Sequence, residues 1–435
     1  MFYYLAAEST SGFDALLLLG LMVIIGMFAG RFIERFNIPN ITGYIVIGLI
    51  IGGLLLVYNY EYIVDNFKVI MSIALGFIAF SIGMELDFKK LKNRRAEVLV
   101  ITIIQALAAF GFTAIGLFIF KIPLPIALVL GAIAIATEPG PILMLTKRYR
   151  SKGPLTDTLV PLHGVEDAFA IIVFGVVLSY AVAQHNGTIL TFNDILVGPI
   201  YELIFSVIIA FTIGFIFKVI IKKLDYDDPE KDSVVFVTAL VAVLISVAIA
   251  NRGFYFLGDH VHLSPILLPM GVGITFANMS SRVAKHETEH VIDQFSPPIM
   301  IAFFTIVGAE IVVILGQESP ALGLSKVAWI AIIYIVFRIF GKLIGSWFGA
   351  KIMKSDESVR KYLGLCLLPQ AQAAIGLAFY TQASLDNTYY GNLVLAVVLI
   401  ATVVYELFGP FGIKFSLRKC KESDEFGNCV IPQNH

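Results

Sequence analysis

Apolar runs of about 20 residues recur along the whole chain, and they constrain its fold more than any other feature. Each run is long enough for an α-helix to cross roughly 30 Å of hydrocarbon. Only 14% of the 435 residues are charged, against about 25% in soluble domains. A water-soluble chain would need more polar residues to cover its surface. The sequence therefore predicts an all-α polytopic membrane protein, embedded in a lipid bilayer.

Charged and turn-rich segments separate the apolar runs and set the number of expected helices. The runs predict thirteen transmembrane helices, at residues 13–35, 41–58, 66–86, 96–120, 124–146, 155–183, 196–222, 233–251, 264–280, 296–315, 325–350, 360–383 and 390–413. An odd number of spans places the two ends of the chain on opposite sides of the membrane. We expect a single transmembrane unit, residues 1–435, with a short cytoplasmic tail at 414–435.

The distribution of Lys and Arg tests this count independently. With thirteen spans, 25 of the 31 basic residues fall on the side of the C-terminus, four fall on the other side, and two, Arg338 and Lys342, fall within a span. Short cytoplasmic loops are enriched in Lys and Arg. We therefore expect a multi-pass protein of the plasma (cell) membrane, with its N-terminus outside and its C-terminus in the cytoplasm.

Two segments of the chain share a weak internal similarity. Residues 77–91 and 303–315 each contain an aromatic stretch, then a small pair with Gly, then Glu followed by apolar residues. They lie in the third and tenth expected spans, and because seven is odd, matched units must have opposite orientations. This predicts an inverted repeat, about 13–183 and about 233–413, joined by the helix at 196–222.

Proline interrupts the fifth and twelfth expected spans, which the repeat matches to each other. The first holds Pro139 and Pro141, and the second holds Pro369. A single Pro would favour a simple kink. Because Pro frees backbone groups that must then face a cavity or an ion, interrupted spans at matched positions indicate discontinuous helices and a transporter's binding site.

Charged side chains inside the spans are few, and each costs about 2.5 to 3.5 kcal/mol to insert at a helix centre. Glu166 and Asp167 are adjacent, so their side chains diverge by about 100° and one can meet an ion while the other meets a partner. Two close carboxylates repel, so one holds a proton unless a cation is present. A proton and a dehydrated cation then compete for one group, which is the chemistry of an antiporter. A buried ion pair that only locks helices is the alternative.

Other buried charges are candidate partners of this pair. Arg338 and Lys342 are four residues apart and share a helix face, so either can neutralise Glu166 or Asp167. A fixed ion pair, for example to Glu310, is the alternative for Arg338. A Lys that loses its charge when its partner takes up a cation would carry a second exchanged proton.

Three further residues receive a candidate role. Glu138 directly precedes Pro139, where its carboxylate would offset the positive N-terminal end of a half-helix. His163 lies one turn before the acidic pair, either as a pH modulator or as a packing residue. We expect Glu406, near the end of the last span, to pair with a neighbouring helix.

Soluble catalytic chemistry finds no support in the sequence. It contains no Walker motif, no dinucleotide fingerprint, no HExxH and no GxSxG. The basic residues follow the cytoplasmic loops and form no patch for nucleic acid. We expect a protein that is not an enzyme and needs no cofactor.

Several short motifs, in this order and spacing, resemble those of the monovalent cation/proton antiporter superfamily, the sodium/proton exchangers and their relatives. They are NIPNITGYIVIGLIIG at 37–52, LGFIAFSIGMELDFKKLKN at 75–93, ATEP at 136–139, GVEDAFAIIVFG at 164–175, FRIFGKLIGSWFGA at 337–350 and LLPQAQAAIGLA at 367–378. Glu138 stands where the family has Asp. The family has Asp-Asp or Asn-Asp at the ion site, whereas this chain has Glu166-Asp167.

The resemblance implies roles for particular residues and a fold. Asp167 would bind the cation and the proton, Thr137 would assist, and Lys342 would be the basic partner. The fold would contain a core, formed by the helices within about 66–183 and 296–383, in which two discontinuous helices cross. This core would move against a dimerisation domain, and the protein would be a homodimer. A second carboxylate with Lys342 present favours the electrogenic branch of the family.

These observations favour a sodium/proton antiporter that expels Na+, with Li+ as a second cation, by alternating access and serves pH homeostasis. A potassium/proton antiporter is the nearest alternative, because the sequence does not measure the size of the ion site. A sodium-coupled symporter for an organic anion, or a channel, is the alternative from another class. Added Na+ alone would move no protons through such a symporter, and a channel would pass current without coupling to the proton gradient.

Overall fold

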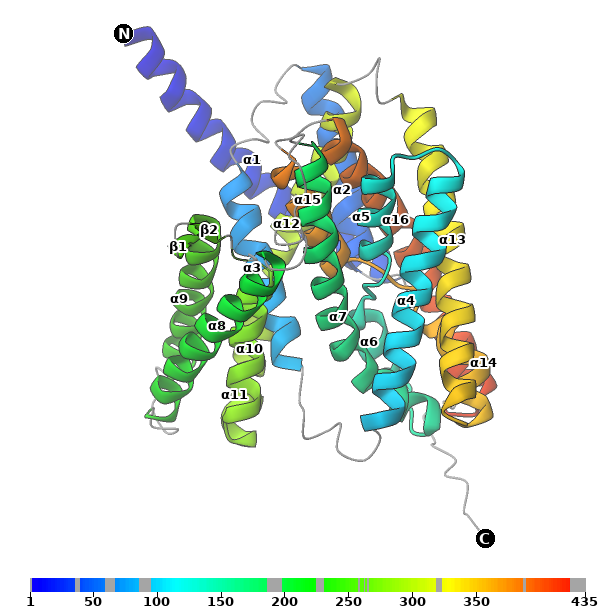
Figure 1. Cartoon of the computed structure of the whole chain (residues 1–435). Coiled ribbons are helices and arrows are strands. Elements are labelled where there is room, and N and C mark those ends of the chain that lie inside the picture. The colour runs from blue at the N-terminus through cyan, green and yellow to red at the C-terminus, as the bar shows by residue number, and fades with distance from the viewer. Residues whose placement is uncertain are drawn as a thin grey trace.

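The computed structural model describes residues 2–35, 40–58, 67–85, 95–185, 198–223, 231–256, 259–261, 263, 266–317, 323–385 and 389–422. Within them the chain forms a bundle of helices (Figure 1). The helices are α1 (Phe2–Glu34), α2 (Asn40–Val57), α3 (Lys68–Glu85), α4 (Arg95–Ile119), α5 (Leu124–Ile133), α6 (Pro139–Arg148), α7 (Pro154–His185), α8 (Gly198–Lys222), α9 (Lys231–Arg252), α10 (Leu267–Met279), α11 (Arg282–Phe295), α12 (Pro297–Gln317), α13 (Leu324–Ile352), α14 (Glu357–Cys366), α15 (Gln372–Ser384) and α16 (Tyr389–Lys419). Two short strands, β1 (Phe254–Phe256) and β2 (Asp259–Val261), pair as an antiparallel hairpin.

The helices confirm the all-α, multi-pass prediction. Each of the thirteen expected spans corresponds to one helix or, for the fifth and twelfth, to two half-helices. Among the described residues, eight helices are long and apolar enough to cross a membrane by themselves, and the bent pair α11–α12 brings the number to nine. Three apolar helical segments, Val69–Met84 of α3, Leu124–Ile133 of α5 and Leu267–Met279 of α10, are shorter than these.

Helix α11 was not expected from the sequence. Its segment is polar, so it lacks the apolar run by which the other helices were found. Ala284, Thr288 and Val291 nevertheless recur at helical spacing and are buried, and the Ser281 hydroxyl caps the first turn by accepting from the Ala284 N–H at 3.1 Å. The helix meets α12 at a bend of 49°.

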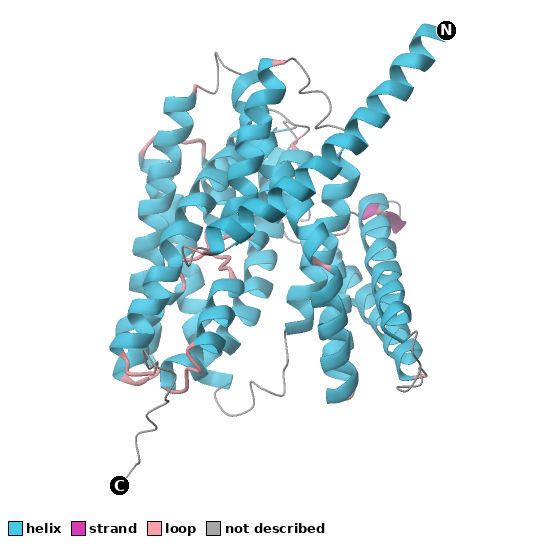
Figure 2. Cartoon of the chain, turned by 180° about the vertical axis from the view of Figure 1, so that it is seen from behind, coloured by secondary structure: helices cyan, strands magenta, loops and turns pink. Residues whose placement is uncertain are grey.

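Small residues allow the closest helix contacts, as is usual in membrane bundles. Helices α2 and α12 approach so closely that a Cβ added at Gly308 would lie 2.9 Å from the Cα of Gly48. Helices α4 and α13 form the most extensive pairing among the described residues, and a Cβ at Gly341 would lie 2.6 Å from the Cα of Ala109. Figures 1 and 2 show α8–α11 and the hairpin on one side of the bundle and α4, α13 and α14 on the other.

The two interrupted spans meet at their breaks, which confirms the crossed discontinuous helices. Helix α5 ends at Ile133, and α6 begins at Pro139 with Pro141 in its first turn. Pro369 lies between α14 and α15. The Glu138 N–H donates to the Pro369 carbonyl at 3.0 Å, so a backbone hydrogen bond joins the two breaks directly. We call these two breaks and their contacts the crossing.

Arg338 of α13 binds the open carbonyls at both breaks. Its Nε donates to the Ala134 carbonyl at 2.9 Å, its Nη2 to the Ala136 carbonyl at 2.8 Å and its Nη1 to the Leu368 carbonyl at 2.8 Å. The guanidinium also stacks on the Tyr405 ring, 4.4 Å from its centroid. Helix C-termini carry unpaired carbonyls and partial negative charge. The positive charge of Arg338 therefore offsets the partial negative charge at the C-terminal ends of α5 and α14. From the sequence, an ion pair of Arg338 with Glu166, Asp167 or Glu310 was also open.

The start of α7 is held by a residue that follows α16. The Leu155 and Thr156 N–H groups each donate to a carboxylate oxygen of Glu422 at 2.8 Å. A carboxylate at a helix N-terminus satisfies free donors and opposes the positive end of the helix dipole. This contact fixes the end of the helix that carries Glu166 and Asp167.

We predict that Arg338→Ala destabilises the protein by about 3 kcal/mol, because three buried carbonyls lose their donors. Thermal unfolding of the purified protein in detergent measures this effect. Arg338→Lys should recover little stability, since an ammonium lacks the planar fork that reaches both breaks. The control is Arg360→Ala, which removes an exposed Arg from α14. Equal melting temperatures for Arg338→Ala and Arg360→Ala would contradict this role.

Candidate functional site

Three parts of the chain bring the predicted site residues together beside the crossing. Helix α7 supplies His163, Glu166 and Asp167, α13 supplies Lys342, and the break between α5 and α6 supplies Thr137. The three charged groups are almost fully buried, with Glu166 and Lys342 at 0% exposure and Asp167 at 2%. Charges at such depth must be compensated by one another.

Glu166 is the centre of the hydrogen-bond network. Its Oε1 accepts from the Lys342 ammonium, from Gln105 Nε2 at 2.8 Å and from Thr137 Oγ1 at 3.1 Å. These donors hold one oxygen of the carboxylate and fix its direction toward α13. Glu166 therefore forms a buried ion pair with Lys342.

Lys342 links this ion pair to the crossing. Its Nζ donates to the Ile135 carbonyl at 2.5 Å and to Thr137 Oγ1 at 2.9 Å, in addition to Glu166. An ammonium has three N–H donors, and these three acceptors match them. The charge of Lys342 therefore depends on both the acidic pair and the break after α5.

Asp167 lies next to Glu166 on α7 but takes a different direction. Adjacent residues on a helix point about 100° apart, so the Asp167 side chain leaves α7 in a different direction from that of Glu166. The charge of Asp167 nevertheless acts on Lys342. One carboxylate is thus fixed to the ammonium, while the other lies close enough to influence it.

His163 and Glu138 occupy the flanks of the site. His163 Nδ1 lies 3.8 Å from Glu166 Oε2, as the one-turn spacing predicts. Glu138 Oε1 accepts from the Gly140 N–H at 3.3 Å, so this carboxylate caps the N-terminus of α6. The capping contact is the electrostatic arrangement that its position before Pro139 suggested.

Two buried amides at the site were missed in the sequence. Gln105 donates to Glu166, and Gln370 Nε2 donates to the Ile133 carbonyl at 2.9 Å, which adds another contact across the crossing. Each is fully buried. For Gln105, a lone amide in the middle of an apolar span was the available signal, because a buried amide needs hydrogen-bond partners.

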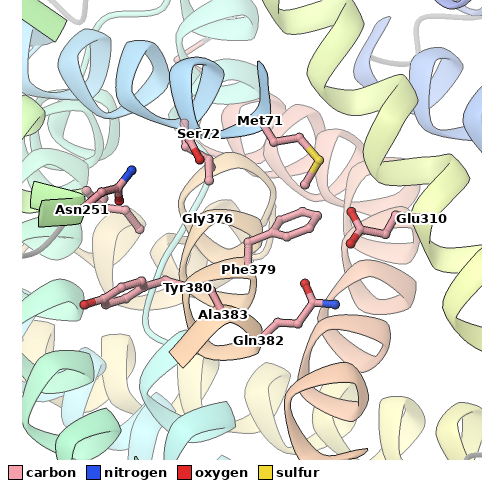
Figure 3. Close-up of a pocket in the computed structure, with 11 residues that line it drawn as sticks. Met71, Ser72, Asn251, Glu310, Gly376, Phe379, Tyr380, Gln382 and Ala383 are labelled. Carbon is pink, nitrogen blue, oxygen red and sulfur yellow. The ribbon is translucent and has the colours of Figure 1, made fainter. Parts of the chain in front are cut away.

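A separate cavity of about 200 Å³ lies between α15 and the helices α3, α9 and α12. Its polar lining comes from Ser72, Asn251, Glu310, Tyr380 and Gln382. Figure 3 shows the Met71 side chain and the Glu310 carboxylate both pointing toward the Phe379 ring. The cavity does not include Glu166 or Asp167, so it is distinct from the network around Lys342.

The chain is similar in sequence to known antiporters over almost its whole length. Residues 19–418 match the family described as "Sodium/hydrogen exchanger, transmembrane". The chain is 23% identical over 414 residues to the ammonium/H+ antiporter subunit AmhT of Alkalihalophilus pseudofirmus, covering 94% of this chain and 96% of that protein. It is 23% identical over 408 residues to a Na+/H+ antiporter of Enterococcus hirae, covering 92% and 98%.

The fold has a solved counterpart. The structure of the sodium proton antiporter MjNhaP1 from Methanocaldococcus jannaschii superimposes with a TM-score of 0.75 at 16% identity, covering 94% of this chain and 99% of that chain. With the family match over nearly the whole length, the chain belongs to the transmembrane sodium/hydrogen exchanger family of antiporters.

Proposed function

We propose that this protein is a sodium/proton antiporter of the plasma membrane, in which Na+ and H+ compete for Asp167. The observation that supports the proposal is a pair of adjacent buried carboxylates, Glu166 and Asp167, of which Glu166 is ion-paired with Lys342. Glu166 is bonded to Lys342, Gln105 and Thr137. Asp167 is buried beside it on the same helix, and we propose that it binds the exchanged ion. Since an ionised carboxylate crossing an apolar barrier needs a countercharge, Asp167 must carry either the cation or the proton.

Lys342 gives the exchange a second proton. When a cation binds at Asp167, it attracts the neighbouring Glu166 carboxylate away from the ammonium. Lys342 then remains a buried charge without its ion-pair partner, which is costly in a low-dielectric medium. Release of a proton removes that cost. We therefore propose that more than one proton moves inward for each cation expelled, so that exchange is electrogenic.

The helix contacts support a division into a moving core and a supporting unit. Helix α13 packs on α4, α14 and α16, and α5 packs on α4 and α7. Helix α3 packs chiefly on α10, and α12 packs chiefly on α2. We propose a core of α4–α7 and α13–α16, which assigns α3 and α12 to the supporting unit although the sequence-based estimate included both in the core. The inverted repeats and the homodimer remain part of this proposal.

We also propose which cations the protein exchanges for protons. Na+ is the favoured cation, because the family is described as a sodium/hydrogen exchanger, and we propose Li+ as a second cation. Ammonium and K+ are the alternatives: AmhT is named as an ammonium/H+ antiporter subunit, and K+ differs from Na+ only in size. We propose that the N-terminus lies outside and the C-terminus in the cytoplasm, with basic loops on the cytoplasmic side.

We predict that Asp167→Asn reduces Na+-driven proton movement in proteoliposomes to the level of empty liposomes, because an amide cannot exchange a proton for a cation. A pH-sensitive dye inside the vesicles follows the reaction. The matched control is Asp157→Asn, which changes an exposed carboxylate on the first turn of the same helix and should leave the rate unchanged. An Asp167→Asn variant that exchanges at the parent rate would refute the assignment.

A dose series with Na+, Li+, K+ and NH4+ separates the candidate cations. We expect Na+ and Li+ to reach half-maximal exchange at concentrations at least about tenfold below those for K+ and NH4+, a difference of about 1.4 kcal/mol in binding. Lowering the pH should raise the half-maximal Na+ concentration, because protons compete for the same carboxylate. A lower half-maximal concentration for K+ would make the protein a potassium/proton antiporter.

A further inference from the structure

A second buried carboxylate lies outside the network around Glu166. Glu406 of α16 is 0% exposed, and neither of its carboxylate oxygens has a hydrogen-bond partner among the described residues. Burying an ionised carboxylate without donors is strongly unfavourable. The expected pairing of Glu406 with a neighbouring helix is not found as a hydrogen bond in the described part of the chain.

The packing of α16 brings Glu406 to the crossing. Gly409 lies on the same helix face one turn later, and a Cβ added there would lie 2.7 Å from Pro369 Cγ. Pro369 in turn accepts the backbone hydrogen bond from Glu138. Helix α16 also packs on α6, which begins directly after Glu138. The turn that carries Glu406 therefore lies against the two breaks.

The charged group that acts on Glu406 has the same sign. Glu138 is the titratable residue whose charge interacts with the Glu406 carboxyl. The two buried cations of α13 are engaged elsewhere: the Arg338 guanidinium binds three backbone carbonyls and the Tyr405 ring, and the Lys342 ammonium binds Glu166. Two neighbouring carboxylates in a low-dielectric site do not both ionise readily.

We propose that Glu406 is a proton-binding site separate from the Glu166–Asp167 pair, and that its ligand is a single proton. With the proton bound, the Glu406 carboxylic acid is neutral and places no second negative charge beside Glu138. Loss of the proton to solvent places a second negative charge beside Glu138. The repulsion acts on Glu138, whose N–H bonds to the Pro369 carbonyl and so joins the two breaks. Proton occupancy at Glu406 therefore controls how the crossing moves.

Proton binding at Glu406 does not depend on transport, but its effect on the exchange rate rests on the proposed antiport function. Deprotonation in alkaline solution would strain the crossing and slow exchange. A Gln at this position is always neutral. It should therefore extend exchange to more alkaline pH while leaving the half-maximal Na+ concentration near neutral pH unchanged.

Proton counting on the purified full-length protein tests the site directly. The protein in detergent is shifted from about pH 9 to about pH 6, a range in which buried carboxyl groups titrate, and a pH dye reports the protons taken up. We expect Glu406→Gln to take up about one proton fewer per chain than the parent. Glu357→Gln, which removes an exposed carboxyl of α14, should match the parent, since exposed glutamates titrate near pH 4.3.

A second readout protects the test against a misfolded variant. Infrared difference spectra of the same pH shift should contain the C=O band of a protonated carboxyl that Glu406→Gln lacks and Asp167→Asn retains. Glu406→Asp keeps a carboxyl group and should shift the band rather than remove it. Proton uptake and spectra of Glu406→Gln equal to those of the parent would overturn the proposal. Exchange that survives Asp167→Asn would instead refute the antiport site and leave the proton count of Glu406 unaffected.

Discussion

The structure depends on how two interrupted helices are stabilised where they cross inside a low-dielectric layer. Each break leaves carbonyls and N–H groups that cannot reach water, and an unsatisfied backbone group in such a medium costs several kcal/mol. Two basic residues one turn apart on α13 satisfy most of the carbonyls: Arg338 binds those of Ala134, Ala136 and Leu368, and Lys342 binds that of Ile135. The negative ends of α5 and α14 thus face fixed positive charge.

This arrangement couples the backbone to the ion site. Lys342 bonds simultaneously to the break and to Glu166, so a change in the charge of the acidic pair acts directly on the crossing. Arg338 is bonded to three backbone carbonyls, which suits a structural role. Lys342, a compact ammonium that can lose its proton, is suited to exchange. We therefore propose different functions for these two cations, which lie on one face of the same helix.

The sequence predicted the number and limits of the spans closely, because bilayer thickness fixes the length of an apolar run. The run expected at 233–251, for example, corresponds to Lys231–Arg252. Matched prolines predicted the two breaks. Sequence could not predict which acceptors Arg338 would bind, or that Gln105 would reach Glu166, because run length does not specify which helix faces meet. Helix α11 was missed because its buried stripe lies in a polar segment.

We propose that cation binding at the acidic pair displaces a proton from Lys342 as well as from Asp167. The most direct test is the response of Na+-loaded proteoliposomes to an imposed membrane potential. We predict that an interior-negative potential accelerates proton entry and Na+ exit in the parent, because more than one proton enters for each Na+ that leaves. A variant with Lys342→Gln that still exchanges should lose this response. An exchange rate in the parent that is independent of potential would contradict the claim.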